Sequence, residues 1–391
     1  MEKVKIIDYY AVGTFHEVVN YSFIKMCASI FKKVQYFSGK TASLNLQQVF
    51  MRTDGKSPTN VHYKVMLNYE RDTPVGARLR DIWGFFLTLY QYIITPYDTL
   101  LFYNYTNKLS LPFILLLNIL FKKKVVCTFH GELEFIEGKV SYLKTSGWYR
   151  QSMRFSFHYL FMKSPAYVMV LGDSIRKNLS TIYPHLFPHI LSICHPYIIN
   201  EIEKYNETEN KNCLVRIGTV GTMKESKGLK DLLHLAELLN DLLKGEKLEL
   251  CSVGRVYANG VDLGNQITWI GYERGLSRDE FEKQVQRLDY LLYLYPVGAY
   301  RFTASGAILD AVKMKKPIIA LHNDYFDYLL DGCPIGYVGN SVEELAQTIR
   351  DIVSGQLCYD FSAGLKKLSE KVSIKHNVHV FKNELYRVGC V

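Results

Sequence analysis

Small and hydroxyl-bearing residues come directly before a predicted helix in the segment 300–317, which reads YRFTASGAILDAVKMKKP. A helix begins with unpaired N–H groups and a partial positive charge, and glycine lets a ligand approach the backbone. Ser305 and Gly306 at such a helix start are therefore expected to bind a phosphate. Asp310, on the same helix, offers a carboxylate to a ribose hydroxyl. The alternative is an ordinary loop with an N-cap serine before a core helix.

Three more glycines of the second half, Gly221, Gly254 and Gly271, stand where strands are predicted to end. The carboxyl ends of parallel strands share one sheet edge, so these loops are expected to face one ligand. Lys227, just before a helix, could neutralise a diphosphate, and Tyr272 could flank a base. Neither a GxGxxG nor a Walker pattern is present, which argues against a nicotinamide cofactor and a P-loop ATPase.

A histidine and a glycine, His130 and Gly131, follow the predicted strand Val125–Thr128. Parallel sheets place their ligands at this position, so His130 is expected to be functional. A buried, hydrogen-bonded structural histidine is the alternative. Gly13 follows the first predicted strand, 4–10, where it could bring the backbone close to a ligand or simply form a turn.

The segment 141–163 is dense in aromatic and basic residues. On a helix, Arg150, Arg154 and His158 fall on one stripe at i, i+4 and i+8. Such a helix can lie on an anionic membrane with its rings in the interface. A packed helix with a solvated basic face is the alternative.

Two other helices are expected near the surface of the first half. Residues 75–92 have a helical pattern that leaves Trp83, Phe85 and Phe86 exposed or half exposed. Residues 109–121 form an apolar helix that is either buried or lies on the surface, and it is too short to span a membrane.

Strands and helices alternate along the first half of the chain, and a second such series begins after residue 213. This pattern predicts two α/β domains. The predicted strands are 4–10, 33–37, 98–103, 125–128 and 167–171, then 214–220, 248–253, 267–270, 288–295 and 318–321. Residues 38–75 give no clear pattern, and the polar stretch 200–212 is the predicted linker. Ser277 and Ser341 are predicted to cap helices, each with a glutamate three residues later.

Length and composition agree with this division. The chain has 391 residues, of which 48% are hydrophobic and 22% charged, so it is globular and too long for one core. The formal charge of +9 favours an anionic partner, whether nucleotide phosphates, acidic lipid or nucleic acid. The eight cysteines include no CxxC pair, which favours reduced thiols over disulfides or a metal site. No signal-peptide pattern is present at the start, so a cytoplasmic location is expected.

Together these motifs resemble the GT-B glycosyltransferases, specifically the family-4-like group (glycosyl transferases group 1). The matching segments are Gly221–Gly228 (Gly-x5-Lys-Gly), Cys251–Arg255, Trp269–Tyr272, Leu291–Pro296, Ile308–Pro317 and Val125–His130. The resemblance covers most of the chain; it is clear for residues 214–321 and weaker before residue 100.

The resemblance implies two Rossmann-like domains with parallel sheets that face a central cleft. Residues 1–196 would bind the acceptor, residues 213–376 the nucleotide sugar, and the helix in 377–391 would pack back on the first domain. The implied reaction moves a sugar from a UDP- or GDP-sugar to an acceptor hydroxyl, without cofactor or metal. A lipid-linked acceptor in cell-surface polysaccharide assembly (capsule, exopolysaccharide or O-antigen) would place the protein on the inner face of the membrane.

The resemblance also assigns residues. His130 would lie near the reacting sugar, and Glu132 or Glu134 would be the base if the reaction inverts the sugar. The residues implied to bind the donor are Gly221, Lys227, Arg255, Tyr272, Arg301, Thr303, Ser305, Gly306 and Asp310. On the acceptor side they are Gly13, His16, Arg150 and Arg154.

Two departures from the family pattern leave the donor and the stereochemistry open. Thr222 and Met223 stand where the family has an arginine, and Phe302 stands where it has the first of two acids. Arg301 or Thr303 is expected to take over donor contacts. Two other functions stay open: a GT-B relative that binds sugars without catalysis, and a basic nucleic-acid-binding protein, although no RNP or helix-turn-helix signature is found.

Overall fold

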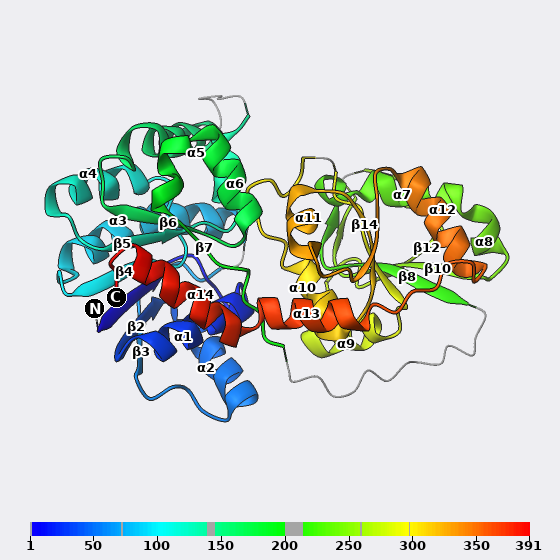
Figure 1. The fold of residues 1–391 in the computed structure, drawn as a ribbon, viewed down its shortest axis with the longest axis horizontal. Coiled ribbons are helices and arrows are strands. Elements are labelled where there is room, and N and C mark those ends of the chain that lie inside the picture. The colour runs from blue at the N-terminus through cyan, green and yellow to red at the C-terminus, as the bar shows by residue number, and fades with distance from the viewer. Residues whose placement is uncertain (1, 72, 139–144, 200–213, 259, 297) are drawn as a thin grey trace. The chain divides into compact units, whose positions relative to one another are not determined.

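The computed structural model describes residues 2–71, 73–138, 145–199, 214–258, 260–296 and 298–391 (Figure 1). The chain divides into two compact units. The N-terminal unit comprises Met1–Ile198, Phe302–Ala304 and Lys371–Val391, and the C-terminal unit comprises Ile199–Arg301 and Ser305–Glu370. The predicted linker 200–212 lies outside the described residues.

The N-terminal unit is built on a seven-stranded parallel sheet with the strand order β3-β2-β1-β4-β5-β6-β7. The strands are β1 (Lys3–Asp8), β2 (Lys33–Ser38), β3 (Val61–Val65), β4 (Thr99–Tyr103), β5 (Val125–Thr128), β6 (Ala166–Val170) and β7 (Ile190–Ser192). The central strands β4 and β5 are buried along their whole length. Continuous apolar runs of this kind are typical of a sheet covered on both faces.

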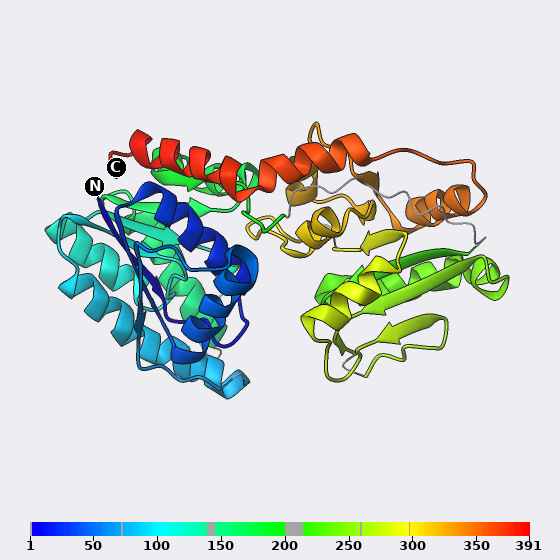
Figure 2. The same ribbon diagram turned by 90° about the horizontal axis from the view of Figure 1, so that it is seen from below.

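Helices cover both faces of this sheet (Figure 1). One layer contains α1 (Glu17–Ile30), α2 (Lys40–Asp54) and α14 (Ile374–Arg387); the other contains α3 (Pro74–Ile94), α4 (Leu111–Phe121), α5 (Thr145–Phe155) and α6 (Asp173–Ile182). Helix α14 lies beside α1 in both views (Figures 1 and 2) and contacts β7. Its Phe381 and Leu385 are buried in the same core as Phe23 and Phe102.

The C-terminal unit contains a six-stranded parallel sheet with the order β12-β10-β8-β13-β14-β15. Its strands are β8 (Val215–Val220), β10 (Leu248–Val253), β12 (Ile267–Ile270), β13 (Tyr290–Tyr293), β14 (Ile318–Leu321) and β15 (Gly336–Gly339), and β9 (Met223–Lys224) pairs with β11 (Val256–Tyr257). Its helices are α7 (Leu229–Leu238), α8 (Asn240–Lys244), α9 (Arg278–Gln286), α10 (Ala307–Met314), α11 (Asp324–Leu330), α12 (Val342–Val353) and most of α13 (Ser362–Val372). The predicted pair of α/β units with parallel sheets is therefore confirmed.

Local signals also agree with the structure. Ser277 and Glu280 form the predicted capping box of α9, and the Ser341 side chain accepts a hydrogen bond at the start of α12. In α3, Trp83 and Phe86 are exposed and Phe85 is half-buried, as predicted. The elements α2, β3, β7 and β15 were not predicted from the sequence.

Candidate active site

Three histidines come together at the carboxyl edge of the N-terminal sheet. His16 is the N-cap residue of α1, His130 follows β5, and His195 follows β7. The ring centroids of His16 and His130 are 4.7 Å apart, and the Tyr105 ring stacks on His130 at 5.8 Å. Residues that follow three other strands, β1, β4 and β7, therefore surround the imidazole that follows β5.

A single hydrogen bond fixes the orientation of His130. Its Nε2–H donates to the backbone oxygen of Asn104 over 2.8 Å, because a carbonyl oxygen can only accept. In the neutral ring the other nitrogen, Nδ1, then carries a lone pair and can accept a proton or a hydrogen bond. The side chain is half-buried, so one part of the ring remains accessible.

Glu132 holds the main chain of His130 in place. Its buried carboxylate accepts hydrogen bonds from the backbone N–H groups of His130 (2.8 Å) and Gly131 (3.1 Å), and the Tyr105 phenol also donates to it. A carboxylate held in this way anchors the loop after β5. These contacts are those of a loop anchor, and the role of Glu132 as a base, which the resemblance implies, stays a prediction.

The Glu134 carboxylate also accepts hydrogen bonds. The segment Phe302–Ala304 belongs to the N-terminal unit, where the Phe302 N–H and the Thr303 hydroxyl donate to Glu134 Oε1 over 3.2 and 2.8 Å. Thr303, which was expected to bind the donor, thus contacts a candidate base. Phe302, at the position of the missing acid, is fully buried.

The sequence analysis missed Asp8, which ends β1 and is buried. Its Oδ1 accepts hydrogen bonds from the N–H groups of Ala11 (3.0 Å) and Tyr10 (3.3 Å). Burial raises the pKa of the Asp8 carboxyl, while the Ala11 hydrogen bond and the charge of His130 act in the opposite direction. Its signal in the sequence was an acidic residue directly after an apolar strand run.

The backbone of His16 adopts the left-handed conformation with φ 58°, which is uncommon for a residue other than glycine. Burial, together with the charges of His130 and His195, holds the pKa of His16 well below its usual range. Strained backbone of this kind tends to occur at functional sites, because the surrounding structure must stabilise it. Gly13, just before it, has φ 55° and donates its N–H to Thr41 Oγ1.

His195 makes the protein sensitive to acid. Burial, with a smaller contribution from the charge of His130, lowers the pKa of His195 from 6.5 to about 4. As the pH falls, His195 is protonated in the unfolded chain before it is protonated in the folded chain. Its contribution to the free energy of unfolding is therefore fully present above pH 6.5 and is lost as the pH drops toward 4. The expected loss from this group is on the order of 3 kcal/mol.

Urea unfolding at several pH values between 7 and 4 measures this loss. His195→Gln should unfold more easily at pH 7 but lose less stability on acidification than the unsubstituted chain. An unchanged pH dependence would show that His195 is not the group that titrates.

Two of the three residues of the predicted basic stripe, Arg150 and Arg154, are engaged within the unit, whereas His158 is exposed in the π-helical turn Ser156–Leu160 that follows α5. Arg150 Nε donates to the Glu137 oxygen over 3.0 Å, and Arg154 Nε donates to the Ile136 oxygen over 2.8 Å. Both side chains are half-buried, so they hold the loop that follows His130 instead of forming a solvated face. Residues 141–144 of the predicted segment lie outside the described residues.

In the C-terminal unit, glycines bring two strand-end loops into main-chain contact. Gly221 follows β8 with φ 84°, and Gly254 follows β10 with φ 135°. A Cβ at Gly254 would lie 2.1 Å from the Gly221 carbonyl oxygen, so only glycine fits there. The Gly254 N–H donates to the Ile270 oxygen at the end of β12, which joins the third loop to the other two.

The loop that contains Lys227 and the start of α10 flank the end of one strand, β13. A Cβ at Gly228 would lie 1.9 Å from the Leu294 oxygen, so this loop packs directly on the chain leaving β13. On the same strand, the Tyr293 hydroxyl donates to the Ala307 oxygen over 2.8 Å. Lys227 is half-buried, and burial, followed by the charge of Lys224, lowers the pKa of its ammonium group.

Helix α10 begins without a side-chain cap. Its N-cap residue is Gly306, and Ser305 is buried in front of it, so the alternative of an N-cap serine is wrong. Among the described residues, apart from the immediate neighbours of Gly306 in the chain, no atom lies within 4 Å of the position that its Cβ would take, and Gly306 is exposed. The helix start is thus open on the side of Gly306.

The other predicted donor residues are placed around these loops. Asp310 accepts a hydrogen bond from Arg278 over 2.9 Å, an ion pair that a ribose would have to share or displace. Arg301 lies 3.9 Å from Asp324. Arg255 and Tyr272 are both exposed, and the Arg255 guanidinium lies over the Tyr257 ring.

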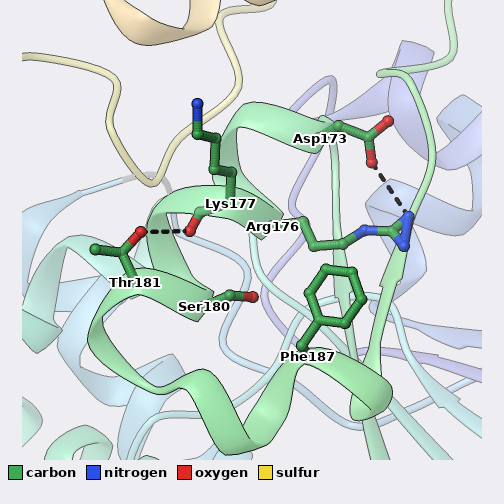
Figure 3. A pocket seen from close by; sticks show the side chains of 6 residues that line it. All are labelled: Asp173, Arg176, Lys177, Ser180, Thr181 and Phe187. Atoms are coloured by element: carbon green, nitrogen blue, oxygen red, sulfur yellow. Dashed lines mark hydrogen bonds and ion pairs between the residues drawn. The ribbon is translucent and has the colours of Figure 1, made fainter.

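A hollow of about 580 Å³ lies elsewhere on the N-terminal unit, over α6 and the following short helix, Pro184–His189 (Figure 3). It is lined by Asp173, Arg176, Lys177, Ser180, Thr181 and Phe187. Arg176 pairs with both Asp173 and Glu384 of α14 at 3.1 Å. No predicted site residue lines this hollow.

Within the described ranges, no three His, Cys, Asp or Glu side chains are grouped so that they could hold a metal ion. The described cysteines are all free thiols.

No model of a protein family matches this chain. No curated protein is significantly similar to it in sequence either.

Solved structures, by contrast, match it over its whole length. Anabaena HepE in complex with UDP and glucose aligns with a TM-score of 0.61 and 11% identity over 100% of both chains. WaaG, a glycosyltransferase involved in lipopolysaccharide biosynthesis, aligns with a TM-score of 0.60 and 13% identity over 99% of both. A glycosyltransferase from Rickettsia africae aligns with a TM-score of 0.59 and 15% identity over 98% of both. At these identities the likeness shows the fold, which is the GT-B fold of glycosyltransferases.

Proposed function

We propose that this chain is a glycosyltransferase that moves a sugar from a nucleotide-diphosphate sugar to an acceptor hydroxyl. The observation that carries the proposal is the arrangement around β13, where the Lys227 loop and the uncapped start of α10 flank one strand end. A lysine and free helix N–H groups are the partners that a diphosphate requires. The structural likeness to HepE, a protein that binds UDP and glucose, is consistent with this assignment.

In this proposal the C-terminal unit binds the donor and stabilises the leaving diphosphate. Lys227 supplies a compact positive charge, and the α10 N–H groups supply oriented dipoles. Asp310 binds the ribose after it exchanges its contact with Arg278. These groups stabilise the leaving charge without a metal ion.

The N-terminal unit supplies the acceptor side and His130. The Asn104 oxygen orients the ring of His130, and Glu132 holds its backbone N–H. The ring nitrogen Nδ1 therefore points in a fixed direction. We assign it to the stabilisation and orientation of the reacting sugar. Glu132 and Glu134 act as positioning residues, because both carboxylates are already bonded to the main chain.

The acceptor is proposed to be a lipid-linked glycan of cell-surface polysaccharide assembly. The net positive charge of the chain supports this assignment, because such acceptors carry phosphate at an acidic lipid surface. Two of the similar structures, WaaG and WaaB, are described as enzymes of lipopolysaccharide synthesis. Because these structures share little sequence with this chain, they support the assignment as an analogy of fold.

A thermal-shift comparison of UDP, GDP, ADP and CMP, with and without EDTA, tests the donor assignment. A ligand that binds only the folded chain raises its midpoint of unfolding. We expect one diphosphate, UDP or GDP, to raise the midpoint equally in both conditions. A shift that EDTA abolishes would contradict metal independence, and no shift with any nucleotide would contradict the donor site.

A further inference from the structure

Helix α3 is amphipathic in the opposite sense to an ordinary surface helix. The side that it buries is polar and includes Arg80, Asp81 and Thr88. These groups are bonded inside the unit; for example, Asp81 accepts from the Tyr9 and Tyr149 hydroxyls over 2.9 and 2.8 Å. The outward side is apolar, and its exposed members are Ile82, Trp83, Phe86, Tyr90 and Ile93. Ordinary surface helices turn their apolar side to the core.

Helix α4 extends this apolar surface. It has no charged residue between Leu111 and Phe121. Phe113 is half exposed to solvent, and Leu120 is 74% exposed. The Phe85 ring contacts both Phe86 (5.1 Å between centroids) and Phe113 (5.4 Å), so the outer sides of the two helices are continuous. We call this surface, on the outer sides of α3 and α4, the α3–α4 face.

The exposed charges on α3 and at the end of α4 are positive. Asp81 is the single acidic residue of α3 and is buried, and α4 contains neither Asp nor Glu. Asp98, between the two helices, is exposed but forms an ion pair with Lys3 at 2.6 Å. Arg78 on α3 and Lys122 at the end of α4 are exposed. An apolar, aromatic surface that has exposed basic residues and no exposed acidic residue on its two helices is complementary to an anionic bilayer interface. A second copy of the face would instead bring like charges together.

We propose that the α3–α4 face binds the surface of an anionic lipid bilayer, with its rings in the interface and Arg78 and Lys122 toward the headgroups. No helix among the described residues is long and apolar enough to cross a membrane, so the contact is made by side chains at the surface. The inference extends the proposed function, because it provides a route to a lipid-linked acceptor. It assigns this contact to α3 and α4, and not to the arginines of α5.

Vesicle co-sedimentation of the full chain tests the proposal. The probes are phosphatidylcholine vesicles with and without phosphatidylglycerol. We expect binding that requires phosphatidylglycerol, and a decrease of roughly tenfold or more in Phe86→Ser/Leu120→Ser, because two large apolar side chains no longer enter the interface. Arg78→Glu/Lys122→Glu should weaken binding in the same way and make the remainder insensitive to salt.

The matched control is Leu44→Ser/Met51→Ser, which removes two side chains of similar exposure from α2, in the other helix layer of the same unit. It should bind vesicles like the unsubstituted chain. Equal loss in the control, or no binding by the unsubstituted chain, would overturn the proposal. Concentration-dependent dimerisation that Phe86→Ser/Leu120→Ser abolishes, measured by sedimentation velocity, would assign the face to self-association instead. The nucleotide thermal shift should be unchanged in all variants, so failure of the donor site and failure of the lipid site are distinguishable.

Discussion

His130→Ala is expected to lower the turnover number by roughly 10²–10³-fold, the usual cost of removing one group that stabilises a transition state. The ring is the half-buried group around which His16, Tyr105 and the loop after β5 are arranged. Donor affinity should stay the same, because the predicted nucleotide loops belong to the C-terminal unit. Single-turnover transfer from a labelled nucleotide sugar separates the two effects.

The matched control is His158→Ala, which removes an exposed histidine of the same unit. It should keep full activity. His130→Gln retains an amide that can donate to Asn104, so it should keep the fold of the loop while most of the activity is lost. Full turnover in His130→Ala would contradict the assignment, and a lost nucleotide thermal shift would indicate that the substitution damages folding instead.

Lys227→Met is expected to weaken donor binding by roughly 10–100-fold, because a charge-assisted hydrogen bond to a phosphate contributes on the order of 1.5–3 kcal/mol. Burial lowers the pKa of the Lys227 ammonium group, so the charge is lost on raising the pH earlier than in an ordinary lysine. Donor affinity should therefore fall as the pH rises through the lowered pKa. Calorimetric titration with the nucleoside diphosphate at several pH values measures both effects.

Lys230→Met serves as the control for charge. Lys230 is exposed in the first turn of α7, and its loss changes the net charge equally. Its ion pair with Glu225 of the Lys227 loop is exposed, so we expect its removal to cost the loop little. Its donor affinity should match that of the unsubstituted chain. Equal weakening in both variants would indicate a general field effect instead of a phosphate contact by Lys227.

Periodicity alone predicted most of both sheets. The strands β4, β5, β10 and β14 are short apolar runs between polar turns, and such runs are easily recognised. The helix caps were equally local, because the Ser277 and Ser341 side chains each accept a hydrogen bond from the N–H of the glutamate three residues later. Elements that depend only on neighbouring residues were therefore predictable.

Two elements in the segment 38–75 were missed. Helix α2 buries Ala42, Leu46, Val49 and Phe50 at helical spacing, so an apolar stripe was present but was overlooked among polar neighbours. Strand β3 lies at the sheet edge and exposes most of its residues. Its place is decided by pairing with β2, which the sequence alone does not specify.

The candidate site was predicted in outline only. The glycine and lysine loops were found because their spacing is local. Asp8, Asn104 and His195 were not found, since they approach His130 through the order of the strands and not through spacing in the sequence. For the same reason the sequence did not show that Glu132 and Arg154 are bonded to main-chain groups near His130.

The packing of α14 has a consequence for how the protein is made. Phe381, Leu385 and Cys390 complete a core whose other members include Phe23, Phe102 and Val126. A ribosome therefore releases the second sheet before the first unit has all of its core. The usual order, in which the N-terminal domain folds first during synthesis, is reversed for the completion of this unit. Until α14 docks, its place on α1 is an uncovered apolar surface, and a chain that stops after residue 370 keeps that surface exposed.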